Sequence, residues 1–447
     1  MKTELHNYDI FPKVFIAQDA VKITIKPLGA HAALDGCDSI SVLSVAHGLV
    51  ENFAQRNNYL EFPVSTDTDG CIRFSHIFPE ESEYLIRINR SGRTAAELSV
   101  YALAEDMRGR YPYRGDLHMH TCRSDGSQSP AVVVANYRRH GYDFTVISDH
   151  GRYYPSLEAI DAYQDVPVEM NIVAGEEIHL PGNDIHIVNF GSDYSVNGLL
   201  ECSDQSMESD RRALIDNPPP VLSEAQYREE VDALAETLDI PKGIEKYNYA
   251  SSVWAFNHIR KGGGLAIYPH PYWKCSGPYH VPETLNAFMT QTHPFDAFEV
   301  LGGENYYQQN GFQTLQYYED RAKGIHYPIV GSTDSHNSIA EDNRNALVCS
   351  TFVFAMENEK DALVAAIKDE YSVAVDTISK EYRLVGDFRL AKYTRFLLDE
   401  FTPLHDELCF EEGRLMKAYV TGDEGADQGL TFVYGRMKKL YEKYFAV

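Results

Sequence analysis

The segment 116–126 holds two imidazoles and a carboxylate at a spacing that suits a metal ion. His118 and His120 are two residues apart, so on an extended strand both side chains point to the same face. Asp125 follows five residues later, where a turn would bring its carboxylate back beside the imidazoles. Taken alone, an H-x-H pair is equally well interpreted as two unrelated polar residues at a strand end, because short motifs match by chance.

Four later stretches repeat this design, in which an apolar run leads into histidine, aspartate or glutamate. The runs over 144–148, 170–175, 264–269 and 327–333 lead into Asp149-His150, Glu176-Glu177, His270 and Asp334-Ser335-His336, and Asp184-Ile185-His186 adds another imidazole. Ligand residues at the C-terminal ends of successive strands are typical of the active face of a βα barrel. The recurrence therefore favours a metal centre over chance.

These residues resemble the motifs of the PHP (polymerase and histidinol phosphatase) family of metal-dependent phosphoesterases, over about residues 113–376. The matching motifs are H-x-H-T-x-x-S-D-G over 118–126, D-H at 149–150, G-x-E over 175–177, H-P at 270–271 and G-S-x-D-S-H over 331–336. The resemblance implies an α/β fold, in the form of a distorted (β/α)7 barrel of PHP type.

The resemblance also implies which residues hold two or three divalent transition-metal ions. One ion would bind His118, His120, Glu177 and Asp334, a second would share Glu177 with His186 and His270, and a third would draw on Asp125, His150 and His336. Histidine and carboxylate ligands suit Mn, Fe or Zn. The choice of Glu177 over the adjacent Glu176 rests on the family spacing. His179, on the same strand face as Glu177, could also reach a metal, although an ordinary hydrogen-bonded histidine is the favoured interpretation.

Divalent ions at such a centre lower the pKa of a bound water, so that hydroxide forms at neutral pH, and two ions stabilise both the attacking and the leaving oxygen. Phosphoester hydrolysis needs both effects. His336 or Asp149 is a candidate general acid for the leaving group. The candidate phosphate-binding residues are Arg152, Arg123, Lys274 and Arg344. Glu299, at the end of another apolar run, is expected to shape the pocket and not to bind metal.

The net charge of −26 disfavours long nucleic acid as a partner, because proteins that follow a polynucleotide backbone generally present basic surfaces. A small-molecule phosphoester remains compatible with this charge, since bound cations reverse the local potential. The chain has no run of 18 apolar residues and no apolar stretch at its N-terminus, so we expect a cytoplasmic protein without membrane association. The seven cysteines are scattered, which argues against a disulfide framework and a thiolate zinc cluster.

Three regions are expected along the chain. Residues 1–108 alternate apolar and polar residues, for example over 84–88, and predict a β-sandwich-like domain whose role is packing support more than substrate binding. Residues 109–379 form the barrel, with an insertion at about 192–249 in which Ser223 to Gln226 is a capping box. Residues 380–447 form a helical C-terminal appendage, whose aromatic spacing indicates core packing or an oligomer contact.

The sequence therefore predicts a metal-dependent hydrolase. Its expected reaction is hydrolysis of a small phosphomonoester or a short nucleotide phosphoester through a metal-bound hydroxide. Two alternatives remain: an amidohydrolase-like enzyme that cleaves a C–N or C–O bond with the same metal geometry, and a binding protein whose metal site is non-catalytic. The full set of expected ligands argues against the second alternative.

Overall fold

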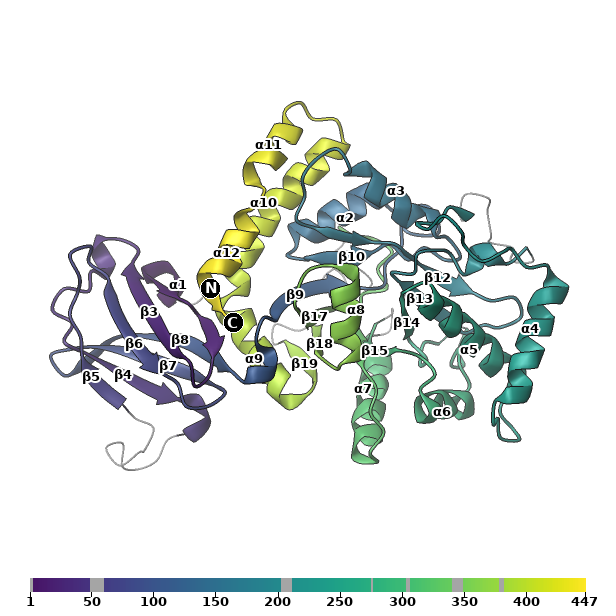
Figure 1. Ribbon diagram of the computed structural model, residues 1–447, viewed down its shortest axis with the longest axis horizontal. Helices are drawn as coiled ribbons and strands as arrows, with labels where there is room; N and C mark the ends of the chain where they lie inside the picture. The colour runs from purple at the N-terminus through teal and green to yellow at the C-terminus, as the bar shows by residue number, and fades with distance from the viewer. Residues whose placement is uncertain are drawn as a thin grey trace. The chain divides into compact units, whose positions relative to one another are not determined.

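The computed structural model describes residues 3–48, 60–201, 211–274, 276–302, 306–339, 349–377 and 382–447. The chain forms two compact units (Figure 1). The first comprises Met1–Tyr111, Lys392–Leu408 and Gly435–Val447, and the second comprises Pro112–Ala391 and Cys409–Tyr434. Within the described residues, no helix combines the length and the apolar character needed to cross a membrane.

The first unit contains two sheets that share one core. The smaller sheet has the order β1 (Tyr8–Phe11), β3 (Ala20–Pro27), β6 (Ile72–Ile77). The larger has the order β20 (Phe445–Ala446), β2 (Val14–Ile16), β8 (Arg93–Leu103), β7 (Ser82–Arg90), β4 (Ser39–Ser44), β5 (Leu60–Pro63). The alternation expected over 84–88 is confirmed in β7, where Tyr84, Ile86 and Ile88 are buried and join Ile23 and Ile25 of β3 in the core.

The second unit contains two further sheets. One has the order β11 (Asn171–Val173), β10 (Phe144–Val146), β9 (Tyr111–Asp116), β17 (Cys349–Ala355), β18 (Ser372–Asp376), β19 (Arg383–Gly386). The other has the order β12 (Gly175–His179), β13 (His186–Phe190), β14 (Leu265–Tyr268), β15 (Ala297–Leu301), β16 (Ile329–Gly331). Strands β9, β10 and β11 are parallel, as are β14, β15 and β16, whereas β13 runs antiparallel to both of its neighbours.

The α/β class predicted from the sequence is confirmed. Among the described residues the hydrogen-bonded ladders form these sheets and not one closed ring. Two isolated parallel bridges connect the sheets of the second unit: Met119 with Ser335, and His150 with Glu177. Strands of both sheets also contribute side chains to one core, which includes Phe144 and Val146 from one sheet and Val188, Ile267 and Val330 from the other.

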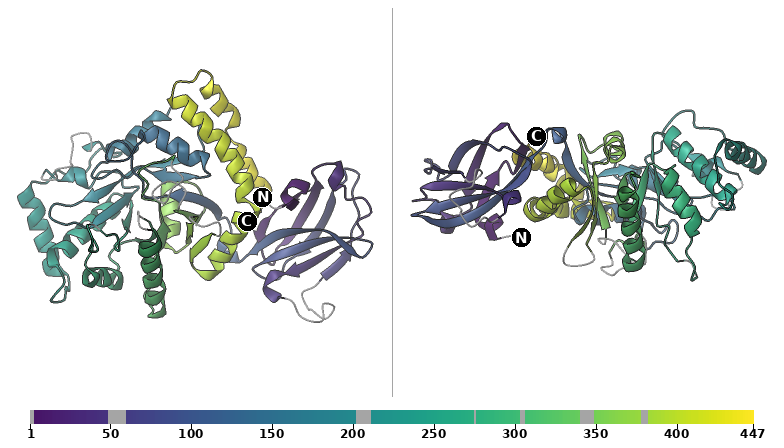
Figure 2. Two further views of the ribbon diagram at one scale, coloured as in Figure 1. Left: turned by 180° about the vertical axis from the view of Figure 1, so that it is seen from behind. Right: turned by 90° about the horizontal axis from the view of Figure 1, so that it is seen from below.

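The α-helices among the described residues are α1 (Thr3–Asn7), α2 (Pro130–Arg139), α3 (Tyr154–Ala162), α4 (Glu224–Thr237), α5 (Lys246–Lys261), α6 (Glu283–Thr292), α7 (Tyr306–Ala322), α8 (Lys360–Lys368), α9 (Phe388–Glu400), α10 (Thr402–Val420), α11 (Ala426–Val433) and α12 (Arg436–Tyr444). The capping box expected in the insertion is confirmed at the start of α4, where Ser223 and Gln226 bond each other's backbone. Helix α4 packs against α5, and this teal pair lies at one edge of the second unit (Figures 1 and 2).

Candidate metal centre

The expected ligands lie at or just beyond the ends of strands in the second unit. His118 and His120 follow β9, His150 follows β10, and His270 follows β14. Glu177 lies within β12, His186 begins β13, and Asp334 and His336 follow β16. Two backbone hydrogen bonds, from Asp334 N to His118 O and from His120 N to Ser335 O, hold the first and last of these segments side by side.

Two of the ligand positions have a left-handed backbone. The φ angle is 30° at His270 and 52° at Asp334. Residues other than glycine rarely adopt such angles, and those that do are concentrated at functional sites, where the surrounding structure must hold them. The packing around these two residues therefore fixes their side chains at a conformational cost.

The ligands expected for the first ion are brought together. His120 Nε2 lies 2.9 Å and His118 Nε2 lies 3.3 Å from Asp334 Oδ1. The same two nitrogens lie 3.7 Å from Glu177 Oε2 and 3.4 Å from Glu177 Oε1. Both imidazoles and Glu177 are buried. The ligands of one tetrahedral ion would lie ~3.3 Å apart at bond lengths of about 2.0–2.1 Å. The compact group of His118, His120 and Asp334 therefore suits one ion.

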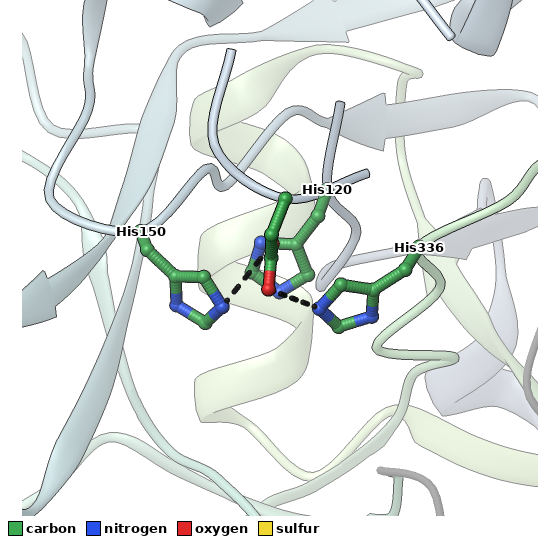
Figure 3. A group of neighbouring side chains, drawn as sticks. His120, His150 and His336 are labelled. Carbon is green, nitrogen blue, oxygen red and sulfur yellow. Dashed lines mark ion pairs between the residues drawn. The ribbon is translucent and has the colours of Figure 1, made fainter. Parts of the chain in front are cut away.

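His270 and Asp125 belong to further groups of ligand atoms. His270 Nε2 lies 3.3 Å from Glu177 Oε1, in a group with His118. Asp125 forms ion pairs with His150 at 3.5 Å and with His336 at 3.3 Å, in a group with His120. Figure 3 shows that the imidazoles of His120, His150 and His336 point toward one another.

Glu177 lies at the meeting point of these groups. Burial alone raises the pKa of its carboxyl, but His186, His150 and His118 outweigh burial, so the pKa lies well below its ordinary value. Burial likewise opposes the shift at Asp334, whose pKa His118, His120 and His270 lower. Both carboxylates therefore carry a negative charge at neutral pH, the state that binds cations.

The adjacent Glu176 points to the other face of β12. Its Oε2 accepts a hydrogen bond of 2.6 Å from Ser195 Oγ, and its Oε1 accepts bonds from the backbone N of Val196 at 2.5 Å and from Asn189. Neighbouring residues of a strand face opposite sides, which explains why Glu177 and not Glu176 lies among the imidazoles. Glu176 instead holds the beginning of the insertion.

Two buried aspartates support the ligand-bearing loops. Asp116 accepts hydrogen bonds from Thr333 Oγ1 at 2.6 Å and from the backbone N of His118 at 3.1 Å. It therefore links the segment that carries His118 with the segment that carries Asp334. Asp149, a candidate general acid, accepts bonds from Thr121 Oγ1 at 2.7 Å and Ser124 Oγ at 2.5 Å. Asp149 thus holds the turn that carries Asp125.

The candidate phosphate-binding residues differ in their surroundings. Arg123 makes a two-pronged ion pair with Glu158 at 2.8 and 2.7 Å, and Lys274 Nζ donates to Gln308 Oε1 at 3.0 Å. Arg152 directly follows the His150 segment, and its backbone N donates to Asp149 O at 3.1 Å. Arg344 lies outside the described residues.

One contact of the site was not predicted from the sequence, and the other involves His179, whose side chain was expected on the same face as Glu177. Glu299 Oε2 lies 2.9 Å from His118 Nδ1, and both side chains are fully buried. His179 Nε2 lies 2.9 Å from His150 Nδ1 and 3.7 Å from Glu177 Oε2. The sequence signal for His179 was its i+2 spacing from Glu177. The contact of Glu299 joins residues 181 positions apart and had no local signal.

The donor set fits divalent metal ions. The buried His118 Nε2 and His186 Nδ1 lie 3.4 and 2.8 Å from Glu177 Oε1, but neither contact has the geometry of a regular hydrogen bond. Buried polar atoms in proteins nearly always have a partner, so atoms such as these call for an ion or a water. Imidazole nitrogens around a shared carboxylate supply the ligand types of transition-metal ions.

Comparison with known proteins finds several solved structures that are similar to this chain. No family model and no curated protein matches the sequence. A two-domain protein from Bacteroides vulgatus, named as containing a predicted PHP-like metal-dependent phosphoesterase, is 16% identical over 60% of this chain and 65% of its own, with a TM-score of 0.37. The match thus spans just under two thirds of that solved chain.

Two further solved structures are similar. A candidate metal-dependent phosphoesterase from Bifidobacterium adolescentis is 16% identical over 51% of this chain and 89% of its own, with a TM-score of 0.32. An amidohydrolase from Chromobacterium violaceum is 22% identical over 50% of this chain and 87% of its own, with a TM-score of 0.31. The names of the two phosphoesterases are those of the family that the motifs resemble.

Proposed function

We propose that this protein is a metal-dependent phosphoesterase of PHP type that hydrolyses a small phosphomonoester or a short nucleotide phosphoester. The observation that carries the proposal is the position of Glu177, a fully buried carboxylate with imidazoles from several strand ends around it. A carboxylate shared between ligand groups is what a centre of two or three ions requires, and Mn, Fe or Zn suits these ligands.

A distorted seven-stranded barrel is the fold that we propose around this centre. The Met119–Ser335 and His150–Glu177 bridges would connect β9 with β16 and β10 with β12. With the ladder from β12 to β16 and the β9–β10 pair, these bridges give a ring of seven strands. The core shared by both sheets would be the interior of that ring.

In this proposal the motif residues hold the ions as the family assignment implies. His118 and His120 each lie near one oxygen of Glu177 and near Asp334 Oδ1. His186 and His270 lie beside Glu177 Oε1, and His150 and His336 flank Asp125. When bound, the ions would supply a nucleophilic hydroxide and neutralise the charge that builds up on the phosphoryl oxygens.

The chain's own residues would bind the phosphate and manage the proton. Arg152 is the first candidate to orient the phosphoryl group, because it follows the ligand segment directly and a guanidinium matches phosphate geometry. His336 Nδ1 donates to Asp334 O at 2.9 Å, which directs its Nε2 toward Asp125 and the site. In a centre of two ions, in which Nε2 of His336 is not bound to metal, protonated His336 is therefore better placed than Asp149 to give a proton to the leaving oxygen.

The decisive experiment measures metal content and hydrolysis together. Purified protein should contain two or three equivalents of transition metal and release phosphate from members of a small phosphoester collection. Asp334→Asn and His118→Ala should each lower both quantities, whereas Asp184→Asn, an exposed carboxylate near the site, should leave both unchanged. Unchanged metal content in both ligand variants would contradict the proposal.

The same experiment separates the alternatives. Amide and carboxyl-ester substrates belong in the collection, because the ligand geometry would also serve cleavage of a C–N or C–O bond in amidohydrolase fashion. Turnover of those substrates without phosphate release would identify such an enzyme. Full metal loading without turnover of any substrate would favour a binding protein.

A further inference from the structure

We propose that His179 is a ligand of the ion held by Glu177 and His186, a role that the PHP motifs do not assign to it. The proposal rests on the metal-dependent function proposed above and specifies it further. In the motif assignment this ion takes Glu177, His186 and His270. In the structure, the ligand atoms of Glu177 and His186 instead form a group with those of His179 and His150.

The backbone places His179 beside both residues. Strands β12 and β13 are antiparallel, and in their register His179 lies directly opposite His186. Glu177 lies two residues before His179 on the same strand, so both side chains extend from the same face. Directly opposite residues of neighbouring strands have Cβ atoms about 4.5–5.5 Å apart, close enough for two imidazoles to share an ion. The rings of His179 and His186 are stacked with centroids 4.2 Å apart.

The ligand atoms form a compact group. One ligand atom each from His150, Glu177, His179 and His186 lie within 4.8 Å of one another. Glu177 presents Oε1 to His186 Nδ1 at 2.8 Å and Oε2 to His179 Nε2 at 3.7 Å. The His179 side chain is 26% exposed, so it lies at the edge of the site, where an ion could enter.

His270 is part of a different group. The candidate group that contains His186 contains His179, whereas His270 is grouped with His118 and Glu177. The His270 ring stacks on that of His118 with centroids 5.4 Å apart. His186 and His270 both lie beside Glu177 Oε1, at 2.8 and 3.3 Å, whereas His179 and His150 lie beside its Oε2, at 3.7 and 2.5 Å. His179 thus supplies an imidazole beside the carboxylate oxygen that His270 does not contact.

An added imidazole would change the metal preference of the position. Imidazole ligands suit Zn, Fe and Cu, whereas carboxylate and water ligands suit Mg and Mn. A set of one carboxylate with several imidazoles should therefore select Zn²⁺ or Fe²⁺ over Mg²⁺. Loss of His179 should reduce this selectivity.

The test measures Zn²⁺ binding to the full chain by chelator competition, with metal content from elemental analysis. Removing a hydrogen-bonding partner of a ligand weakens metal binding about 10–100-fold. Removing a ligand itself should therefore weaken metal binding at one site by more than ~100-fold. We expect His179→Ala to lose one Zn²⁺ equivalent or to weaken one site by more than ~100-fold. His179→Asp keeps a ligand atom and should restore the stoichiometry.

His280→Ala is the matched control. The His280 ring also lies beside His186, with centroids 4.8 Å apart, but its Nε2 contacts the backbone oxygen of Asp184 and it belongs to no ligand group among the described residues. This control should bind Zn²⁺ as the unmodified protein does.

Two outcomes would overturn different conclusions. If the unmodified protein binds its ions and His179→Ala weakens no site by as much as ~100-fold, the ligand role of His179 is wrong and the proposed function stands. If the unmodified protein binds no transition metal at all, the proposed function itself is wrong. Circular dichroism of His179→Ala shows whether the variant is folded, and the His179→Asp variant decides the question if it is not.

Discussion

Glu299 lies directly behind His118, with its Oε2 2.9 Å from the Nδ1 of the imidazole and both side chains fully buried. A hydrogen bond from Nδ1–H to this carboxylate leaves the Nε2 lone pair of His118 directed at Glu177 and Asp334. Carboxylates in such positions fix the ring orientation and make the imidazole a stronger ligand. Glu299 is therefore a positioning residue of the candidate metal centre.

Replacing Glu299 by glutamine should weaken metal binding. Glu299→Gln keeps the shape of the side chain but removes its charge, and outer partners of metal ligands are worth about 10–100-fold in affinity. Chelator competition with Zn²⁺ measures the change. The exposed Glu283 provides the control, because Glu283→Gln should leave the affinity unchanged. Equal affinities in the two variants would show that Glu299 does not support the site.

Adding a methyl group at Gly302 should displace Glu299. A Cβ built at Gly302 would lie 2.1 Å from Glu299 Oε1, which is far inside van der Waals contact. Gly302→Ala should therefore weaken Zn²⁺ binding and lower the melting temperature. A Cβ at Gly311 within α7 would meet no atom within 4 Å, so Gly311→Ala should raise stability by about 0.5–1 kcal/mol. Thermal unfolding that ranks the two variants in the opposite order would contradict this account.

Chelation should destabilise the protein. Ions that bind only the folded state stabilise it by about 2.7 kcal/mol per site when the free ion exceeds the dissociation constant 100-fold. EDTA should therefore lower the melting temperature of the unmodified protein, and Zn²⁺ should restore it. Asp334→Asn should respond less, since it has lost a ligand. An equal shift in both proteins would place the stabilising ion away from Asp334.

Stability should fall in mild acid because of His258. Burial, with Lys261 as a smaller contribution, lowers the pKa of this imidazole to about 4, below the ordinary value of about 6.5. The unfolded chain then binds the proton more readily than the folded one, so the contribution is complete above pH ~6.5 and is lost as the pH falls toward 4.

Denaturant titrations between pH 4 and pH 7 measure this effect. His258→Phe should keep the ring contact with Trp254. Its loss of stability in acid should be smaller than that of the unmodified protein, and the difference should be at most about 3 kcal/mol. His326→Phe, at an exposed position, should follow the unmodified protein. Identical pH profiles for all three proteins would show that His258 does not titrate with unfolding.

Oligonucleotide length should affect hydrolysis only over the first few nucleotides. The net charge of −26 leaves the ions and a few basic side chains to neutralise phosphates, and Arg123 is already paired with Glu158. Values of kcat/KM measured over a length series should therefore reach a plateau. A steady rise with length, together with a steep fall with salt, would indicate many phosphate contacts and contradict the small-substrate proposal.

The sequence by itself determined the residue types of the site and much of the local structure. The period-two alternation over 84–88 predicted a strand, and Ser223 with Gln226 predicted a helix start, because both signals depend on residues close together in the chain. The spacing of His118 and His120 and the motifs after later strands predicted which imidazoles and carboxylates converge.

Tertiary structure alone decided which of these groups touch. The pairing of His179 with His186 depends on the register of β12 and β13, and the contact of Glu299 with His118 spans 181 positions. A register shift of one residue would turn His179 to the other face, and nothing in the local sequence states that register. Contacts of this kind depend on how whole strands pair and pack, so they follow only from the folded chain.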